Sequence, residues 1–215
     1  MEVFTPIAGR RTAFSLNYAT CLPTVEVNAT FYRMPAESTL RAWAEQTPRQ
    51  FRFAVKAHRR ITHVRRLRDV RRMCGGPRNG CRCSGNGWAP CCSSARRRCR
   101  DLELLEDFLA SLPSLPRVAV EFLHPTWFQP GTYRLLTRYR VALCAAEDGE
   151  GSDPLVWTAP FGYLRLHRLR YGPEDLSAWA ARLRGATVGE VFCYFTHKTG
   201  PDAVRFARAL MERCA

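Results

Sequence analysis

The stretch from Thr24 to Lys56 constrains the fold of this chain more than any other part of the sequence. Residues 25–28 alternate between apolar and polar side chains, the period-two pattern of a strand, and residues 51–55 repeat that pattern. Between them, residues 36–46 carry apolar side chains at helical spacing. A strand, a helix and a second strand in this order form the unit from which parallel sheets are built.

The second half of the chain continues the same alternation of strands and helices. The patterns predict strands at 117–122, 141–146, 161–167 and 190–198, and helices at 101–113, 131–140, 173–185 and 201–214. Regular alternation of this kind is typical of a parallel sheet with helical crossovers. The sequence therefore predicts an α/β protein.

Several blocks of sequence resemble one known family. VEVNATFYRMP, FRFAVKAHRRITH, VAVEFLHPTWF and FGYLRLH, with the closing YF…G…A…FA pattern, are similar to the YecE-like family, also called domain of unknown function 72. The resemblance covers roughly residues 24–69 and 101–210. It implies a single YecE-like domain over residues 1–215 with a TIM-type (β/α)8 barrel fold, and the family has no established activity. Leu123 stands where the family usually has an arginine.

Two parts of the chain depart from the expected barrel. Residues 1–22 contain no convincing first strand, so we expect the N-terminus to be truncated and the barrel to be incomplete. Residues 70–100 hold eight arginines, six of the ten cysteines, no acidic residue and no Leu, Ile or Phe. We expect this segment to be disordered and the fourth strand to be scrambled, because it offers almost no apolar surface to offset the entropy of ordering.

Three explanations of residues 70–100 compete. A zinc site would need paired cysteines at C-x₂₋₄-C spacing, which the segment lacks. A disulfide cluster fits poorly with a chain that has no secretory signal. The third explanation, which we favour, is a pair of compensating frameshifts near Arg72 and Arg100.

Composition limits the compartment and the partners. The 215 residues include no apolar stretch of the roughly 20 residues that span a membrane, so we expect a cytoplasmic protein without a membrane partner. The formal net charge of +14 favours an anionic partner, namely a small phosphorylated ligand or a nucleic acid. Neither a cofactor nor an oligomeric state can be assigned from the sequence.

Polar residues at strand ends are the candidates for chemistry, because barrel enzymes place their sites at the C-terminal ends of the strands. We predict catalytic roles for Glu121, His167 and Lys56. The predicted ligand-binding residues are Asn28, Tyr32, His63, His124, Trp127, Arg165 and Tyr194. No H-x-H or E-x-x-H spacing supports a metal, and we predict none.

Each of these roles has a structural alternative. Glu121 follows apolar residues and would be costly to bury unless a cation such as Arg165 or Lys56 pairs with it. His167 could act as an acid or base, or simply form a hydrogen bond at the rim. Lys56 could be a base or a Schiff-base amine, although anion binding is the plainer role. The aromatic residues Tyr32 and Trp127 could stack on a ligand or pack over the barrel mouth.

Three functions therefore remain open. The first is an enzyme acting on a sugar phosphate or nucleic acid. The second is a non-enzymatic protein that binds an anion. The third is an inactive product of a frame-disrupted gene.

Overall fold

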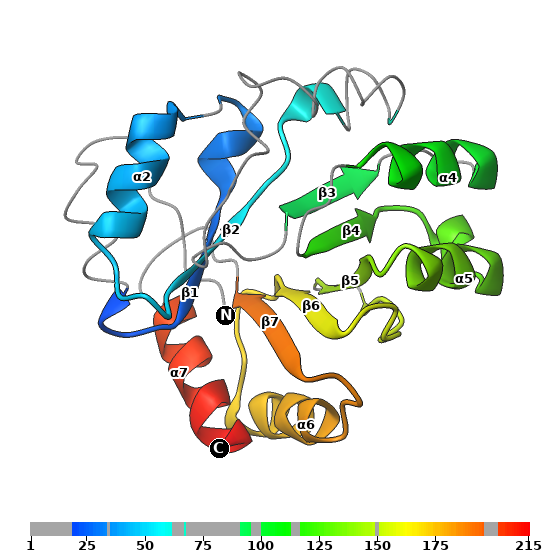
Figure 1. Cartoon of the computed structure of the whole chain (residues 1–215). Coiled ribbons are helices and arrows are strands. Elements are labelled where there is room, and N and C mark those ends of the chain that lie inside the picture. Colours follow the sequence, from blue (N-terminus) through cyan, green and yellow to red (C-terminus); the bar gives the residue numbers. More distant parts are fainter. Residues whose placement is uncertain are drawn as a thin grey trace.

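The computed structural model describes residues 19–33, 35–61, 67, 91–95, 100–112, 117–148, 151–195 and 202–215. Within these ranges, two parallel sheets form the centre of the molecule. β1 (Thr24–Val27) pairs with β2 (Arg52–Val55) in a two-stranded sheet. The five-stranded sheet has the order β3 (Cys91–Ala95), β4 (Val118–Phe122), β5 (Ala142–Glu147), β6 (Phe161–Leu166) and β7 (Glu190–Phe195). The two sheets lie beside each other with their strands inside the molecule (Figure 1).

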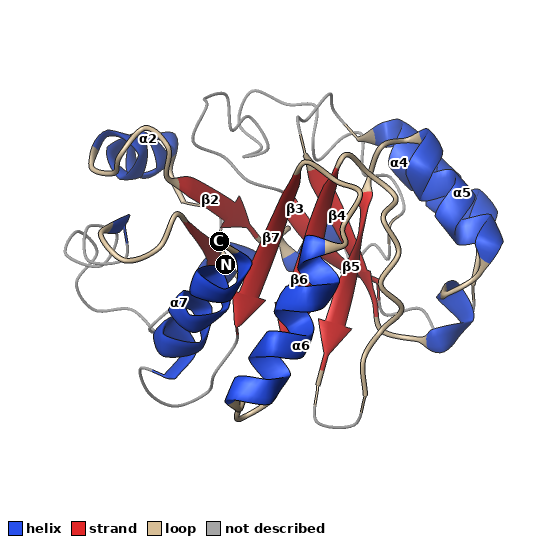
Figure 2. Cartoon of the chain, turned by 90° about the horizontal axis from the view of Figure 1, so that it is seen from below, coloured by secondary structure: helices blue, strands red, loops and turns tan. Residues whose placement is uncertain are grey.

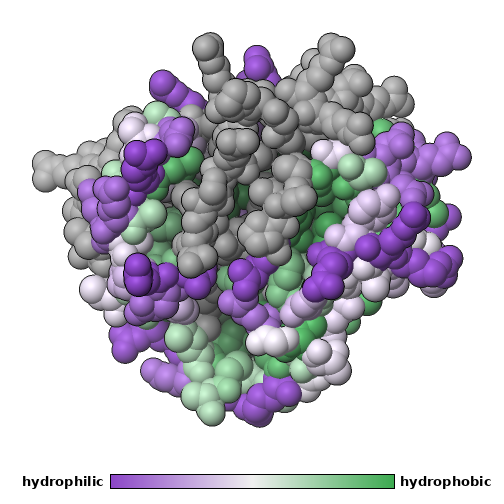
Figure 3. Space-filling model, in the orientation of Figure 1, coloured by the Kyte–Doolittle hydropathy of each residue, from purple (hydrophilic) through white to green (hydrophobic). Residues whose placement is uncertain are grey.

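Helices lie outside the strands (Figure 2). They are α2 (Glu37–Glu45), α4 (Leu102–Ser111), α5 (Pro130–Arg138), α6 (Pro173–Arg184) and α7 (Asp202–Cys214), with short 3₁₀ turns η1 (Asn28–Phe31) and η3 (Pro125–Trp127). This confirms the alternation predicted from the sequence for the segments outside residues 70–100. Figure 3 shows hydrophilic and hydrophobic side chains side by side on this face of the molecule.

The strands are buried on both faces. Every residue of β1, β4 and β6 is buried, as expected for parallel strands covered by helices on one side and facing other strands on the other. Outward residues of β4 and β5, such as Val120 and Leu143, pack with Leu105 and Phe108 of α4. The inward residues form a separate cluster of small and aromatic side chains: Ala54, Ala119, Ala142, Cys144, Phe161, Tyr163, Phe192 and Tyr194.

The inward cluster joins the two sheets. Ala54 of β2 belongs to it although its other members come from the five-stranded sheet. The Thr24 hydroxyl of β1 also forms a hydrogen bond of 3.0 Å with the Tyr194 hydroxyl of β7. No backbone pairing joins β1 or β2 to the larger sheet within the described residues, so these two sheets are not closed into one ladder.

The strand β3 corrects the prediction for the Cys/Arg-rich segment. Cys91–Ala95 pairs in parallel with Val118–Phe122 over five residue pairs, so the expectation of a scrambled strand is wrong at these positions. A parallel ladder is formed by backbone N–H and C=O groups, and a segment without large apolar side chains can therefore still join it. The rest of residues 70–100, except Arg100, lies outside the described residues, as does the expected missing strand in residues 1–18.

Candidate functional site

Two carboxylates and one guanidinium form an ion cluster on the inward face of the strands. Arg165 of β6 donates from Nε and Nη2 to Glu26 of β1, at 3.2 and 2.9 Å. Its Nη1 donates to both carboxylate oxygens of Glu121 of β4, at 3.1 and 2.9 Å. We call Glu26, Glu121 and Arg165 the buried triad, because their side chains are 0, 5 and 6% exposed.

Arg165 has two carboxylate partners in the triad, which bears on its predicted role as a ligand-binding residue. The predicted ion pair between Glu121 and Arg165 is present, but Glu26 is a second partner. The guanidinium donates charge-assisted hydrogen bonds to a carboxylate on either side, Glu26 and Glu121, and these bonds hold it in place. A bound phosphate would have to compete with both carboxylates, so Arg165 is poorly placed as the ligand-gripping residue that the sequence predicted. Taken alone, the triad carries one negative charge in excess.

Lys56 and His167 follow the triad toward the C-terminal ends of the strands. Lys56 lies two residues beyond Ala54, a member of the inward cluster, and His167 lies two residues beyond Arg165, so both continue the inward face. The Lys56 ammonium lies 5.3 Å from the centre of the Phe31 ring. Its backbone is fixed at both polar groups, because its N–H donates to the Val27 carbonyl at 3.3 Å and its carbonyl accepts from the Thr30 hydroxyl at 2.7 Å.

The surroundings of His167 favour the neutral imidazole. Burial lowers its pKa, and the positive charges of Arg165 and, to a smaller extent, Lys56 lower it further. Glu121 and Glu26 act in the opposite direction without cancelling the effect. His167 is therefore a neutral base in the pH range where an ordinary histidine begins to take up a proton.

Asp153 adds an acid that the sequence analysis missed. Its carboxylate accepts a hydrogen bond of 3.1 Å from the backbone N–H of Ala146, near the end of β5. Burial raises the pKa of Asp153 to about 6, and the nearby charges of Glu121 and Asp148 contribute. The residue lies in an acidic loop with no periodic pattern, so no sequence signal separates it from its solvated neighbours.

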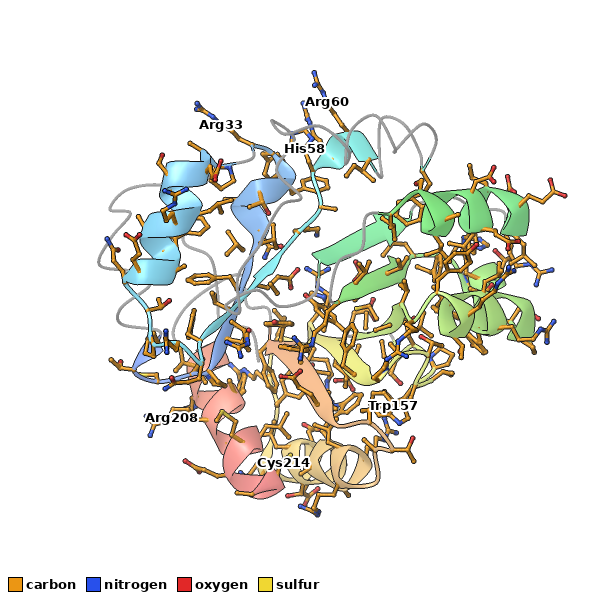
Figure 4. The ribbon with its side chains drawn as sticks, in the orientation of Figure 1. Arg33, His58, Arg60, Trp157, Arg208 and Cys214 are labelled. Carbon is orange, nitrogen blue, oxygen red and sulfur yellow. The ribbon has the colours of Figure 1, made fainter. Side chains whose placement is uncertain are left out.

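Loops at the ends of β1 and β2 form an exposed basic surface. We call Arg33, His58, Arg59 and Arg60, together with Tyr32, the basic ridge. His58 Nε2 forms a hydrogen bond of 3.1 Å with the Tyr32 carbonyl, which ties the two loops together. Arg33, Arg59 and Arg60 are exposed, and the Tyr32 side chain is 71% exposed. Arg33, His58 and Arg60 project from the same end of the molecule, opposite Arg208 (Figure 4).

The remaining predicted site residues do not all join this site. Trp127 is fully buried and stacks on Phe122 at 4.6 Å, so its ring is part of the core and offers no face to a ligand. Tyr194 is likewise buried within the inward cluster. His124 accepts hydrogen bonds at the start of η3, which is a capping role.

Two further predicted residues have other outcomes. Asn28 begins η1 at the end of β1 and is half-buried near the predicted rim. His63 lies outside the described residues.

Among the residues that the structure describes, no three His, Cys, Asp or Glu side chains come together as metal ligands. None of the described helices is long and apolar enough to cross a membrane.

The fold and site describe an α/β protein with parallel strands and an inward-facing ion cluster. The sequence profile of the family described as "Protein of unknown function DUF72" matches residues 3–215. The chain therefore belongs to this family, which is also the YecE-like family, and the resemblance seen in the sequence is confirmed. No curated protein matches the chain.

Crystal structures of two DUF72 family proteins share the fold. The protein from Enterococcus faecalis V583 is 16% identical, with a TM-score of 0.74 over 93% of this chain and 92% of that one. The protein from Thermotoga maritima MSB8 is 20% identical, with a TM-score of 0.67 over 94% of this chain and 88% of that one. At these identities the likeness shows the fold and carries no information about a ligand.

Proposed function

We propose that this protein binds a phosphate-containing ligand, either a sugar phosphate or a nucleic acid, at the C-terminal ends of its strands. The observation that carries this proposal is the position of Lys56. Lys56 follows the inward residue Ala54 by two positions, and its ammonium has no ion pair with a carboxylate among the described residues. A cation that is held in place without a carboxylate is suited to an anionic ligand.

The basic ridge supports the same ligand class. It places three exposed arginines and a histidine beside the loop that follows β1, and these arginines have no carboxylate partner among the described residues. Arginine forms bidentate hydrogen bonds with phosphate, and the exposed ring of Tyr32 offers a stacking surface for a sugar or base.

His167 supports chemistry on the bound ligand. A neutral imidazole next to an ammonium can accept a proton from the ligand while the cation stabilises the negative charge that develops. We therefore place the acid–base role on His167 and the charge-stabilising role on Lys56. Glu121 is held by Arg165 and keeps that guanidinium in place.

We further propose that both sheets belong to one TIM-type barrel. The support is the contact between their inward faces, which includes the Glu26–Arg165 ion pair between β1 and β6 and the Thr24–Tyr194 hydrogen bond between β1 and β7. Inward side chains that fill the space between strands are typical of a barrel interior.

The binding test compares three variants with the native chain. Isothermal titration would measure ribose 5-phosphate, and fluorescence anisotropy would measure a labelled short oligothymidine between about 50 and 300 mM salt. Lys56→Gln should weaken ribose 5-phosphate binding roughly 10- to 100-fold, because a charge-assisted hydrogen bond contributes about 1.5–3 kcal/mol. The double variant Arg33→Ala/Arg60→Ala should flatten the salt dependence of oligothymidine binding, and Arg208→Ala should change neither ligand.

The outcomes separate the functions. Unchanged binding of both ligands by Lys56→Gln would overturn the proposal. Turnover of phosphodiesters or sugar phosphates that is lost in His167→Asn would establish an enzyme. Binding without turnover on such a panel would leave the non-enzymatic anion-binding function.

A further inference from the structure

Lysine is rare in this chain. Only two of its 33 basic residues are lysines, Lys56 and Lys198, and all the others are arginines. Lys198 lies outside the described residues, whereas Lys56 directly follows β2 and continues its inward face. An amine can lose its proton and attack a carbonyl carbon, and a guanidinium does neither in a protein. Lys56 is therefore the one primary amine side chain among the described residues.

The contacts of Lys56 fit a nucleophile. Hydrogen bonds to both backbone polar groups, from Thr30 and to Val27, fix the point from which the side chain extends. The ammonium lies over the face of Phe31, an apolar surface. The carboxylates of Glu26 and Glu121 on this inward face are both paired with Arg165. Lys56 has no ion pair with a carboxylate among the described residues, so its nitrogen is not held by a fixed partner.

His167 supplies the proton transfers that the reaction needs. Its imidazole forms no hydrogen bond with any described side chain, and the charge of Lys56 is close enough to affect its protonation. As a neutral base it can take a proton from the Lys56 ammonium. As the resulting acid it can return that proton to a departing hydroxyl group.

We infer that Lys56 forms an imine with the carbonyl group of a phosphorylated sugar whose phosphate is held by the basic ridge. This rests on the proposed phosphate-binding function. The Lys56 nitrogen forms a bond to the carbonyl carbon, giving a carbinolamine, and the carbon–oxygen bond of that adduct then breaks. One ammonium and one carbonyl become one protonated imine and one water, and His167 ends with the protonation that it had at the start.

The test uses reductive trapping. The native protein is incubated with ribose 5-phosphate or with pyridoxal 5′-phosphate, which carries both an aldehyde and a phosphate, and is then reduced with borohydride. Pyridoxal without the phosphate is the matched probe. Peptide mass mapping locates the adduct, and the only competing amines in the chain are Lys198 and the N-terminus.

We expect the adduct on Lys56, with at least about tenfold more labelling by pyridoxal 5′-phosphate than by pyridoxal. That ratio corresponds to about 1.4 kcal/mol of phosphate binding. Labelling should fall to the rate of the urea-unfolded chain in His167→Asn. Arg208→Ala, at the opposite end of the molecule in Figure 4, should label like the native protein.

Lys56→Arg distinguishes this inference from the function on which it rests. The variant keeps a cation, so it should still bind ribose 5-phosphate in isothermal titration while it loses the adduct. Native protein that binds ribose 5-phosphate but gives an adduct only on Lys198 or the N-terminus would overturn the imine and leave the binding function intact. Native protein that binds no phosphate ligand would overturn both.

Discussion

Replacing Arg165 by methionine should destabilise the protein strongly. The guanidinium is the partner of both Glu26 and Glu121, and all three side chains are at most 6% exposed. Breaking a buried ion pair by removing one partner costs about 3–5 kcal/mol, because the other charge stays buried without compensation. Two carboxylates lose the same partner here, so we expect the upper end of that range, about 5 kcal/mol.

A loss of this size is a large part of the total stability of a domain, which is about 5–15 kcal/mol. For a chain of this length it corresponds to a fall of about 10–20 °C in Tm. Urea unfolding followed by tryptophan fluorescence would measure the change. Trp127 is a suitable reporter because it is buried against Phe122, the residue after Glu121 in β4.

The surface pair between Arg138 and Glu106 provides the matched control. Its atoms are 2.7 Å apart, but the two side chains are 69 and 41% exposed, so Arg138→Met should cost about 0–1 kcal/mol. If Arg165→Met fails to fold, Glu26→Gln and Glu121→Gln in the same chain should restore folding by removing both buried charges. The reasoning is refuted if Arg165→Met lies within about 1 kcal/mol of Arg138→Met.

Three further predictions concern pH and packing. The pKa of Asp153 is raised to about 6 in the folded protein, so its contribution to stability is present at pH 4 and lost as the pH rises through about 6. The Tm of Asp153→Asn should therefore rise relative to that of the native chain as the pH increases over this interval. The pKa of His167 is lowered, so the midpoint of its titration followed by NMR should lie below pH 6.5. A midpoint above 6.5 would contradict the burial of this residue. Gly162→Val should destabilise by about 1–3 kcal/mol in urea unfolding because a Cβ would overlap the Trp157 ring, whereas Gly189→Ala has open space and should be nearly neutral.

Local sequence patterns were sufficient to predict most of the helices and strands. The helix expected at 173–185 forms as Pro173–Arg184 with Gly185 at its C-terminal cap, since proline favours the first turn and glycine the residue after the last. The strand at Cys91–Ala95 escaped prediction because its pairing depends on backbone groups and on the neighbouring strand. Neither of these leaves a periodic pattern in the sequence.

The candidate site was predictable only in part. Polar residues at strand ends identified Lys56, Glu121, Arg165 and His167, and the structure places Glu121 and Arg165 in contact. The contact between Arg165 and Glu26 joins residues 139 positions apart, and only the packing of the two sheets determines it. A strand predicted from the sequence also does not determine the direction of the side chains in the turn that follows it. Trp127 follows β4, yet η3 turns it into the core.

The side chains on the inward face differ along the strands, so substitutions at different levels should affect either stability or ligand binding. Ala119 and Tyr163 of the inward cluster precede Glu121 and Arg165 along their strands, and Ala54 and Tyr194 lie level with Glu26 and Arg165. Lys56 and His167 come last along β2 and β6. Arg165 pairs with both buried carboxylates, whereas Lys56 pairs with no carboxylate among the described residues and is the cation to which we assign the ligand. Losing Arg165 should therefore appear mainly in unfolding. Lys56→Gln should instead change ligand binding and imine trapping. Its free energy of unfolding should change by less than about 1 kcal/mol, since the half-buried Lys56 has no ion pair with any described residue to lose.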